Sequence, residues 1–184
     1  MRGFVIFLAF MWLPSCWAAH AFAQFGDIKY PANFKFFEYV NPQAPKGGEL
    51  VLVPPSRVTS FDKFNPFTLK GTSAPGLGQL VFESLLVGTM DEPTTAYGLL
   101  AEDVSVASDK KSVVFKIRAN ARFNNHDPVT ASDVKHSFDT LVSKEAAPQF
   151  RTLYAEVAGV NVLDTRTVRF DFKRPNPELP LIVG

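Results

Sequence analysis

The sequence predicts an α/β protein with an α+β part, and three patterns carry that prediction. Residues 49–53 form a short apolar run that ends at two prolines, which is typical of a buried strand in a parallel sheet. Residues 99–118 and 157–172 each alternate apolar and polar side chains on both sides of a turn, which predicts two antiparallel hairpins. An amphipathic helix with a strong start signal follows the first hairpin and begins at Thr130.

The composition describes a globular chain and excludes several classes of function. Of 184 residues, 46% are hydrophobic and 20% are charged, as in ordinary folded domains. The formal net charge is +1, so nothing favours binding to nucleic acid or to an anionic membrane. The sequence contains no nucleophile-elbow, metalloprotease or phosphate-loop motif. We therefore expect a protein that is not an enzyme and uses no cofactor.

The N-terminus has the pattern of a secretory signal peptide. Arg2 supplies the positive start, Phe4–Leu13 the apolar segment, and Ala21-Phe22-Ala23 a small-residue cleavage site. We expect residues 1–23 to be removed by cleavage after Ala23 during export to the periplasm.

The single cysteine, Cys16, lies inside this segment. Leu13-Pro14-Ser15-Cys16 has a faint likeness to a lipoprotein cleavage site, but proline is unfavourable there. The favoured expectation is that Cys16 is discarded, with lipidation of Cys16 as the alternative. A mature chain without cysteine has neither disulfide nor thiolate chemistry.

Residues 24–48 form an arm rich in aromatic and turn-forming residues. Proline and glycine interrupt it too often for a regular element, so we expect its aromatic side chains to pack across a larger body. The predicted strand of residues 49–53 follows and ends at Pro54. Residues 57–68 then form a polar and aromatic loop.

The next segment, residues 74–88, predicts a helix with weak points. A Thr-Ser pair at 72–73 can cap it, whereas Gly76 and Gly78 weaken it. Its apolar side consists of Leu77, Leu80, Val81, Leu85 and Leu86. Glu83 is either an exposed helix residue, which is the commoner case, or a buried functional carboxylate. Residues 90–97 have the composition of a turn-rich connector.

The best-defined unit is the first hairpin with its helix. Thr130 is placed as the N-cap, and Asp133 is its capping-box partner in place of the usual Glu or Gln. Val129 and Val134 flank the cap as a hydrophobic staple. In the turn before the helix, Asn125 and His126 tolerate a positive φ at some cost.

The second hairpin joins residues 157–163 to residues 167–172. We expect both hairpins to form one antiparallel sheet with the Thr130 helix against it. Pro148 ends the chain segment after that helix, and three further prolines interrupt the region after residue 172. The apolar ending at Gly184 predicts a cut through an element.

The order of these motifs resembles the family-5 solute-binding proteins, the peptide- and nickel-binding receptors of bacterial ABC importers. Leu100-Ala101-Glu102 through Arg118 follows the family's first pattern, and Phe123 through Phe138 follows its second. Val104 stands where an aromatic residue is common. Residues 36–50, FFEYVNPQAPKGGEL, resemble the Yej-type oligopeptide-binding branch.

The resemblance implies a periplasmic binding protein-like II fold that is incomplete in this chain. Residues 1–23 are the signal peptide, and residues 24–73 are an N-terminal arm with the first strand and loop of the large lobe. Residues 74–172 are a smaller accessory α+β domain with antiparallel hairpins and a capped helix. Residues 173–184 begin the return to the large lobe.

The same resemblance implies the function of an importer's substrate-binding component. The protein would capture oligopeptides or peptide-like compounds in the periplasm as a monomer and deliver them to ABC permease subunits in the inner membrane. The loop after the first strand would face the ligand cleft. Its candidate ligand contacts are Pro54, Arg57, Thr59, Ser60, Phe61 and Asn65. The alternative for this loop is a solvated connector with Phe61 and Phe64 tucked into the core.

Two other functions remain open. One is a receptor of the same fold for nickel or a metal complex, because His126, Asp127, Asp133 and His136 are the only cluster that suggests a metal. The capping role already accounts for Asp133, so no metal site is expected. The other is a stand-alone periplasmic interaction domain built on the hairpin and helix.

Overall fold

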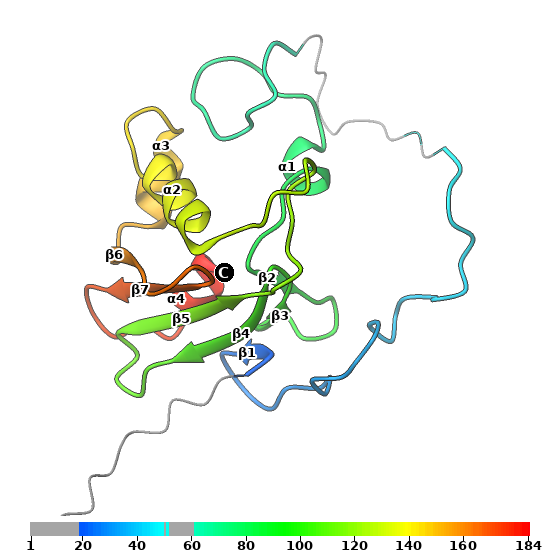
Figure 1. Cartoon of the computed structure of the whole chain (residues 1–184), viewed down its shortest axis with the longest axis horizontal. Helices are drawn as coiled ribbons and strands as arrows, with labels where there is room; N and C mark the ends of the chain where they lie inside the picture. The colour runs from blue at the N-terminus through cyan, green and yellow to red at the C-terminus, as the bar shows by residue number, and fades with distance from the viewer. Residues whose placement is uncertain (1–18, 50, 52–60) are drawn as a thin grey trace, which may run out of the picture.

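The computed structural model describes residues 19–49, 51 and 61–184 and contains two antiparallel sheets with helices against them (Figure 1). The larger sheet has the order β4-β5-β7-β6 and the smaller the order β1-β3-β2. The strands are β1 (Ala21–Ala23), β2 (Leu86–Gly88), β3 (Thr95–Gly98), β4 (Ala101–Val106), β5 (Ser112–Ile117), β6 (Val157–Val162) and β7 (Thr167–Phe172). The helices are α1 (Leu77–Leu80), α2 (Ala131–Leu141), α3 (Pro148–Leu153) and α4 (Leu179–Val183).

The four-stranded sheet joins the two predicted hairpins, and this expectation is confirmed. β5 and β7 pair antiparallel at its centre, with Val113 opposite Phe170 and Phe115 opposite Val168. These four side chains lie on one face because strand residues alternate with period two, and all four are buried. They form the centre of the main hydrophobic core.

Helix α2 covers that face of the sheet, as Figure 1 shows. The Phe138 ring lies 5.7 Å from the Phe170 ring and 5.4 Å from the Tyr154 ring, both in edge-to-face geometry. The predicted capping box is present, because the Asp133 carboxylate accepts hydrogen bonds from the Thr130 N–H (2.8 Å) and hydroxyl (2.7 Å). The structure therefore has the predicted arrangement, in which the Thr130 helix packs against an antiparallel sheet.

The helix predicted over residues 74–88 is mostly wrong. Only the single turn α1 is helical. Its N-cap, Gly76, lies in the left-handed region, and the turn buries no residue. Leu85 and Leu86 instead lie in the main core, and Leu86 begins strand β2. An apolar pair fits a short strand as well as a helix, and burial at the sheet decides between them. Glu83 is exposed, which agrees with its commoner interpretation.

Two further elements correct the prediction. The segment 90–97 is not only a connector, because Thr95–Gly98 form β3, the central strand of the three-stranded sheet. Pro148 was expected to end a segment, but it lies in the first turn of helix α3. Its missing N–H needs no partner there. At the end of the chain, α4 follows the prolines, and Leu179 and Pro180 are buried.

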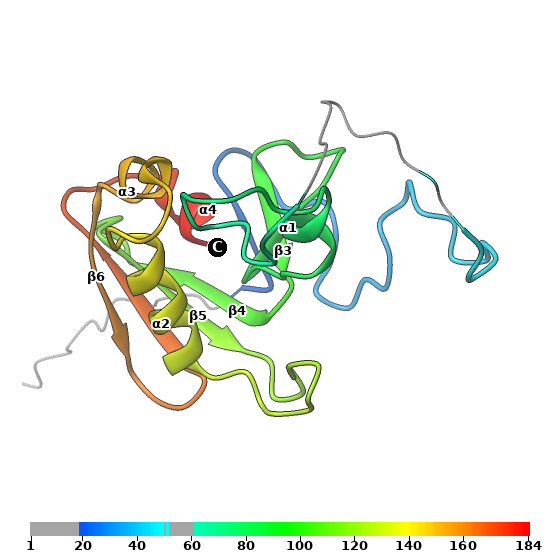
Figure 2. The same cartoon turned by 90° about the horizontal axis from the view of Figure 1, so that it is seen from above.

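The arm packs through its aromatic residues, as expected, but only along its first part. Tyr30, Phe34 and Phe37 surround the ring of Tyr97 from β3 at centroid distances of 5.2 to 5.6 Å. Residues 40–49 are exposed and run away from both sheets (Figure 2). Of the strand predicted at residues 49–53, Glu49 and Val51 have no regular structure, and the other three residues lie outside the described part.

Candidate functional site

The predicted ligand loop is described only from Phe61 onward. Pro54, Arg57, Thr59 and Ser60 lie outside the described residues, so their place in a site stays a prediction. Phe61 and Asn65 are described, and both are exposed. The Asn65 side-chain oxygen accepts a hydrogen bond from the Phe67 N–H at 2.9 Å, which forms a turn within the loop.

Residues 61–73, which we call the site loop, are closed by their own hydrogen bonds. Asp62 and Thr72 hold its two ends together: the Asp62 N–H donates to the Thr72 carbonyl (3.0 Å), and the Thr72 N–H donates to the Asp62 carboxylate (2.8 Å). Lys63 Nζ crosses the loop to the Thr68 carbonyl at 2.7 Å. Gly71 has a φ of +85°, and a Cβ there would lie 2.5 Å from Asp62 Oδ1, so the closure requires glycine.

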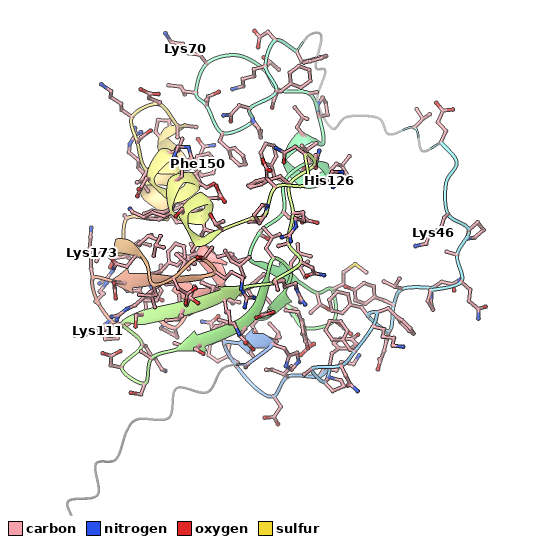
Figure 3. The ribbon with its side chains drawn as sticks, viewed as in Figure 1. Lys46, Lys70, Lys111, His126, Phe150 and Lys173 are labelled. Carbon is pink, nitrogen blue, oxygen red and sulfur yellow. The ribbon has the colours of Figure 1, made fainter. Side chains whose placement is uncertain are left out.

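Phe67 attaches the site loop to the body of the protein. Its ring packs edge-to-face on Phe82 (5.0 Å between centroids) and on Phe150 of α3 (5.8 Å). Its carbonyl accepts a hydrogen bond from the Ala147 N–H at 2.9 Å. Figure 3 shows Phe150 beneath the loop and Lys70 at its outer end. The loop is therefore held at its base by α3, while its outer part projects away from the sheets.

Several apolar side chains are exposed on the site loop. Phe61 and Phe64 contact each other edge-to-face at 5.5 Å, with 52% and 73% of their surfaces exposed. The alternative in which both rings are tucked into the core is thus wrong. Other exposed apolar side chains belong to the loop or follow it: Leu69, Leu80, Val81 and Phe82. Such a surface suits contact with apolar groups of a ligand or of another protein segment.

The family-like motif residues of the first hairpin make contacts that hold the fold together. Glu102 forms ion pairs with Lys116 (3.1 Å) and Arg166 (3.2 Å). The pKa of the Glu102 carboxyl is lowered, and the hydrogen bond from Lys116 is the main cause. The Arg118 guanidinium donates to the Leu99 carbonyl (2.6 Å) and the Gly98 carbonyl (2.8 Å). These contacts tie β4, β5 and the chain before them together.

The four candidate metal ligands, His126, Asp127, Asp133 and His136, do not form one cluster. Asp133 is engaged by Thr130, and Asp127 accepts a hydrogen bond from the Asn125 amide at 2.6 Å within its own turn. His126 and His136 are both exposed, one in the turn and one on α2. Within residues 19–49, 51 and 61–184, no three His, Cys, Asp or Glu side chains are placed to hold a metal ion.

A groove lies between α2, α3 and β6. This groove has a volume of about 500 Å³, and its polar lining includes Lys135, Arg151, Tyr154 and Lys173. Burial raises the pKa of the Tyr154 hydroxyl. The sequence-based prediction named none of these residues as a site, because they come from separate elements and no local pattern connects them.

A polar cluster fastens the arm to the loop between β2 and β3. The Asp91 carboxylate accepts hydrogen bonds from Lys29 Nζ (2.8 Å), from the Tyr30 hydroxyl (2.5 Å) and from the Thr89 hydroxyl. Lys29, followed by Thr89 and Tyr30, holds the pKa of Asp91 well below its usual range. Two causes raise the pKa of Tyr97 to about 12: burial is the larger, and the hydrogen bond to the Glu92 carboxylate is the second. With each group engaged, the cluster serves to anchor the arm.

Helices of membrane-spanning length and hydropathy do not occur in the part of the chain that the structure describes.

Comparisons with known proteins agree with the resemblance in the sequence motifs. The family model for bacterial extracellular solute-binding proteins, family 5 Middle, matches residues 95–184. Uncharacterized protein y4wM of Sinorhizobium fredii is 45% identical over 159 residues, which cover 86% of this chain and 23% of that protein. The probable peptide-binding protein YejA of Agrobacterium fabrum is 41% identical over 160 residues, or 86% of this chain and 25% of that protein. The chain thus spans about a quarter of the length of these relatives.

Among solved structures, NikA from Brucella suis in complex with Fe(III)-EDTA is similar in fold and sequence. It is 26% identical with a TM-score of 0.55, and the match covers 65% of this chain and 23% of NikA. The unliganded open form of MppA, a periplasmic murein tripeptide-binding protein, has a TM-score of 0.58 at 18% identity over 67% of this chain and 27% of MppA. The second match concerns the fold alone.

Proposed function

We propose that the chain is part of a family-5 bacterial extracellular solute-binding receptor that delivers oligopeptides to an ABC importer, because the model of that family matches residues 95–184. Its mixed sheets and helices form a portion of the type II periplasmic-binding-protein fold. That family consists of extracellular solute-binding proteins. The proposed receptor works in the periplasm with permease subunits of the inner membrane.

One observation carries the choice of peptide as the ligand. The chain is 41% identical, over 86% of its length, to a protein named as a probable peptide-binding protein. An extended peptide is held by strand-like backbone hydrogen bonds, with tolerant pockets for its side chains. The exposed rings of Phe61 and Phe64 are suited to such tolerant contacts.

We further propose that the stretch from Pro54 to Asn65 contacts the ligand. In open α/β sheets, ligands bind beyond the carboxyl ends of strands, and this stretch follows the strand predicted at residues 49–53. The closed, anchored base of the site loop supports this role, because it fixes where the outer part lies. In the same proposal, residues 24–73 begin the large lobe, and residues 74–172 form the accessory domain.

Uptake by the host bacterium tests the proposed ligand. Deletion of the coding sequence should slow the disappearance of a mixture of short peptides from the medium, followed by mass spectrometry. Free amino acids in the same medium serve as the control and should disappear at the wild-type rate. Equal rates of peptide loss in the deletion strain and the wild type would contradict the proposal.

Photo-crosslinking tests the proposed site separately. A photoreactive phenylalanine analogue at Phe61 should crosslink to the peptide mixture in the complete exported receptor that contains this chain. The matched control is the same analogue at Leu163, which is similarly exposed (55%) but lies in the turn between β6 and β7. Crosslinking at Leu163 and none at Phe61 would reject the site while leaving peptide uptake intact.

A nickel or metal-complex receptor is the second candidate, and the likeness to NikA favours it. If it is right, the deletion strain loses uptake of labelled nickel and keeps peptide uptake.

A further inference from the structure

Strand β1 consists of residues that the signal-peptide pattern places before its cleavage point. Ala21, Phe22 and Ala23 pair antiparallel with Tyr97, Ala96 and Thr95 of β3. β3 lies at the centre of its sheet, so β1 is one of its two neighbours. Removal of residues 1–23 would therefore leave one edge of β3 without its strand.

The backbone around β1 is hydrogen-bonded to the rest of the fold on both sides. Ala19 and Val104 exchange a pair of N–H to carbonyl hydrogen bonds of 3.0 and 2.8 Å. The Gly98 N–H donates to the His20 carbonyl at 2.8 Å, and the Gln24 N–H donates to the Thr94 carbonyl at 2.9 Å. These partners belong to β4, β3 and the loop before β3, so the segment joins both sheets.

The side chains of this segment are also part of the cores. Ala21 is only 3% exposed and packs in a cluster with Tyr30 and Tyr97. His20 Nε2 is 2.8 Å from the Tyr30 carbonyl, and Phe22 packs on the main core. A leader that is discarded makes no contact in the finished protein. Its loss here would uncover Tyr97 and leave buried polar backbone groups without partners, which is costly.

We propose that the exported protein keeps β1 and that signal peptidase cleaves after Ala18. Cys16 and Ala18 lie outside the described residues, but in the sequence they supply small side chains at the two positions that a cleavage site needs. A cut one residue later would place Trp17 at the outer of these positions. Ala18 is also closer than Ala23 to the end of the apolar segment at Leu13.

The reaction is hydrolysis of the Ala18–Ala19 peptide bond. One water molecule is consumed, the leader leaves with a new carboxylate on Ala18, and the protein gains an α-amino group on Ala19. That nitrogen is the atom that lies 3.0 Å from the Val104 carbonyl, so the new terminus keeps a hydrogen-bond acceptor. The leader including Cys16 is discarded, and the mature chain has no thiol.

Mass spectrometry of the exported protein from the full coding sequence tests this directly. The N-terminal peptide should begin at Ala19. A product that begins at Gln24 would overturn the proposal, and so would a lipid-modified product that begins at Cys16.

Two matched substitutions test the site even if folding is disturbed, because signal peptidase acts on the chain before it folds. Ala18→Leu should accumulate as uncleaved precursor, with loss of the mature form in a pulse-chase experiment. Ala23→Leu should be cleaved like the wild type. Accumulation of precursor with Ala23→Leu and normal cleavage of Ala18→Leu would overturn the proposal. Neither result depends on what ligand the protein binds.

Discussion

His126 has a φ of +71°, in the left-handed region where a side chain costs free energy. The turn around it is fixed by two backbone hydrogen bonds of 2.9 Å, from Phe123 to Asp127 and from His126 to Phe123. The strain is thus held in place by the turn rather than relaxed. A residue other than glycine at this position therefore has a physical cost in the structure.

We expect His126→Gly to raise the free energy of unfolding by up to about 1 kcal/mol. Relief of about 1–2 kcal/mol of left-handed strain outweighs the entropy of glycine in the unfolded chain, about 0.5–1 kcal/mol. Urea denaturation measures the change. The matched control is His136→Gly in α2, which should lower the free energy of unfolding by about 0.4 kcal/mol because glycine is a poorer helix former than histidine. A loss of stability in both variants would contradict the assignment.

Asp91 should make stability depend on acidic pH. Its folded pKa lies below the ordinary value of 3.8, chiefly because Lys29 donates to its carboxylate. A carboxyl group with a lower pKa in the folded protein than in the unfolded chain stabilises the fold at pH values above its unfolded pKa. That stabilisation is lost as the pH falls through the folded pKa. The urea midpoints of the wild type and Asp91→Asn should therefore differ at pH 7 and converge as the pH drops below 3.8. A difference that stays constant with pH would contradict this role.

At the scale of elements, α2 owes its start to a side-chain pair rather than to its burial alone. Thr130 and Asp133 satisfy backbone groups that the first turn leaves without partners. Val129 and Val134 pack on the core on either side of the cap. The cap therefore fixes where the helix begins against the four-stranded sheet.

Thr130→Ala and Asp133→Ala should each lower the free energy of unfolding by about 1 kcal/mol, since each removes half of the capping box. The double variant should lose less than the sum, because either change already breaks the reciprocal pair. Ser132→Ala, exposed in the same turn, serves as the control and should change stability by less than about 0.5 kcal/mol. Strictly additive losses in chemical denaturation would show that the two side chains act independently.

The four-stranded sheet and α2 could be predicted because their signals are local. Alternation along β5 and β7 and the cap at Thr130 each lie within a few residues. β3 could not be predicted in this way. Thr95–Gly98 follow a run of turn-forming residues, and the strand is defined by partners at Ala21–Ala23 and Leu86–Gly88. Its burial is a property of the tertiary structure, which short sequence patterns do not encode.

At the scale of the whole molecule, the candidate site is the least predictable part. Phe67 anchors the site loop to Phe150, and the groove beside α2 gathers side chains from four separate segments. Such long-range contacts leave no local pattern. Only the loop's place after an expected strand, together with the family resemblance, suggested a ligand role for Phe61 and Asn65.

We expect the chain of 184 residues to show no stoichiometric binding of short peptides. A closing cleft needs two walls, and the chain spans about a quarter of the length of the relatives it matches. Isothermal titration calorimetry with a mixed peptide library provides the measurement. Heat with a clear stoichiometric endpoint would show that this part of the fold forms a complete site.

The pairing of β1 with β3 also affects the order of events during synthesis. Ala21 cannot meet Tyr97 until the intervening chain has left the ribosome, and the Leu86 N–H finds its acceptor only at Gly184. Contacts between residues so far apart form late and slow folding. Until these contacts form, the nascent chain lacks this part of its tertiary structure, which is the state that a translocation channel for unfolded polypeptides accepts.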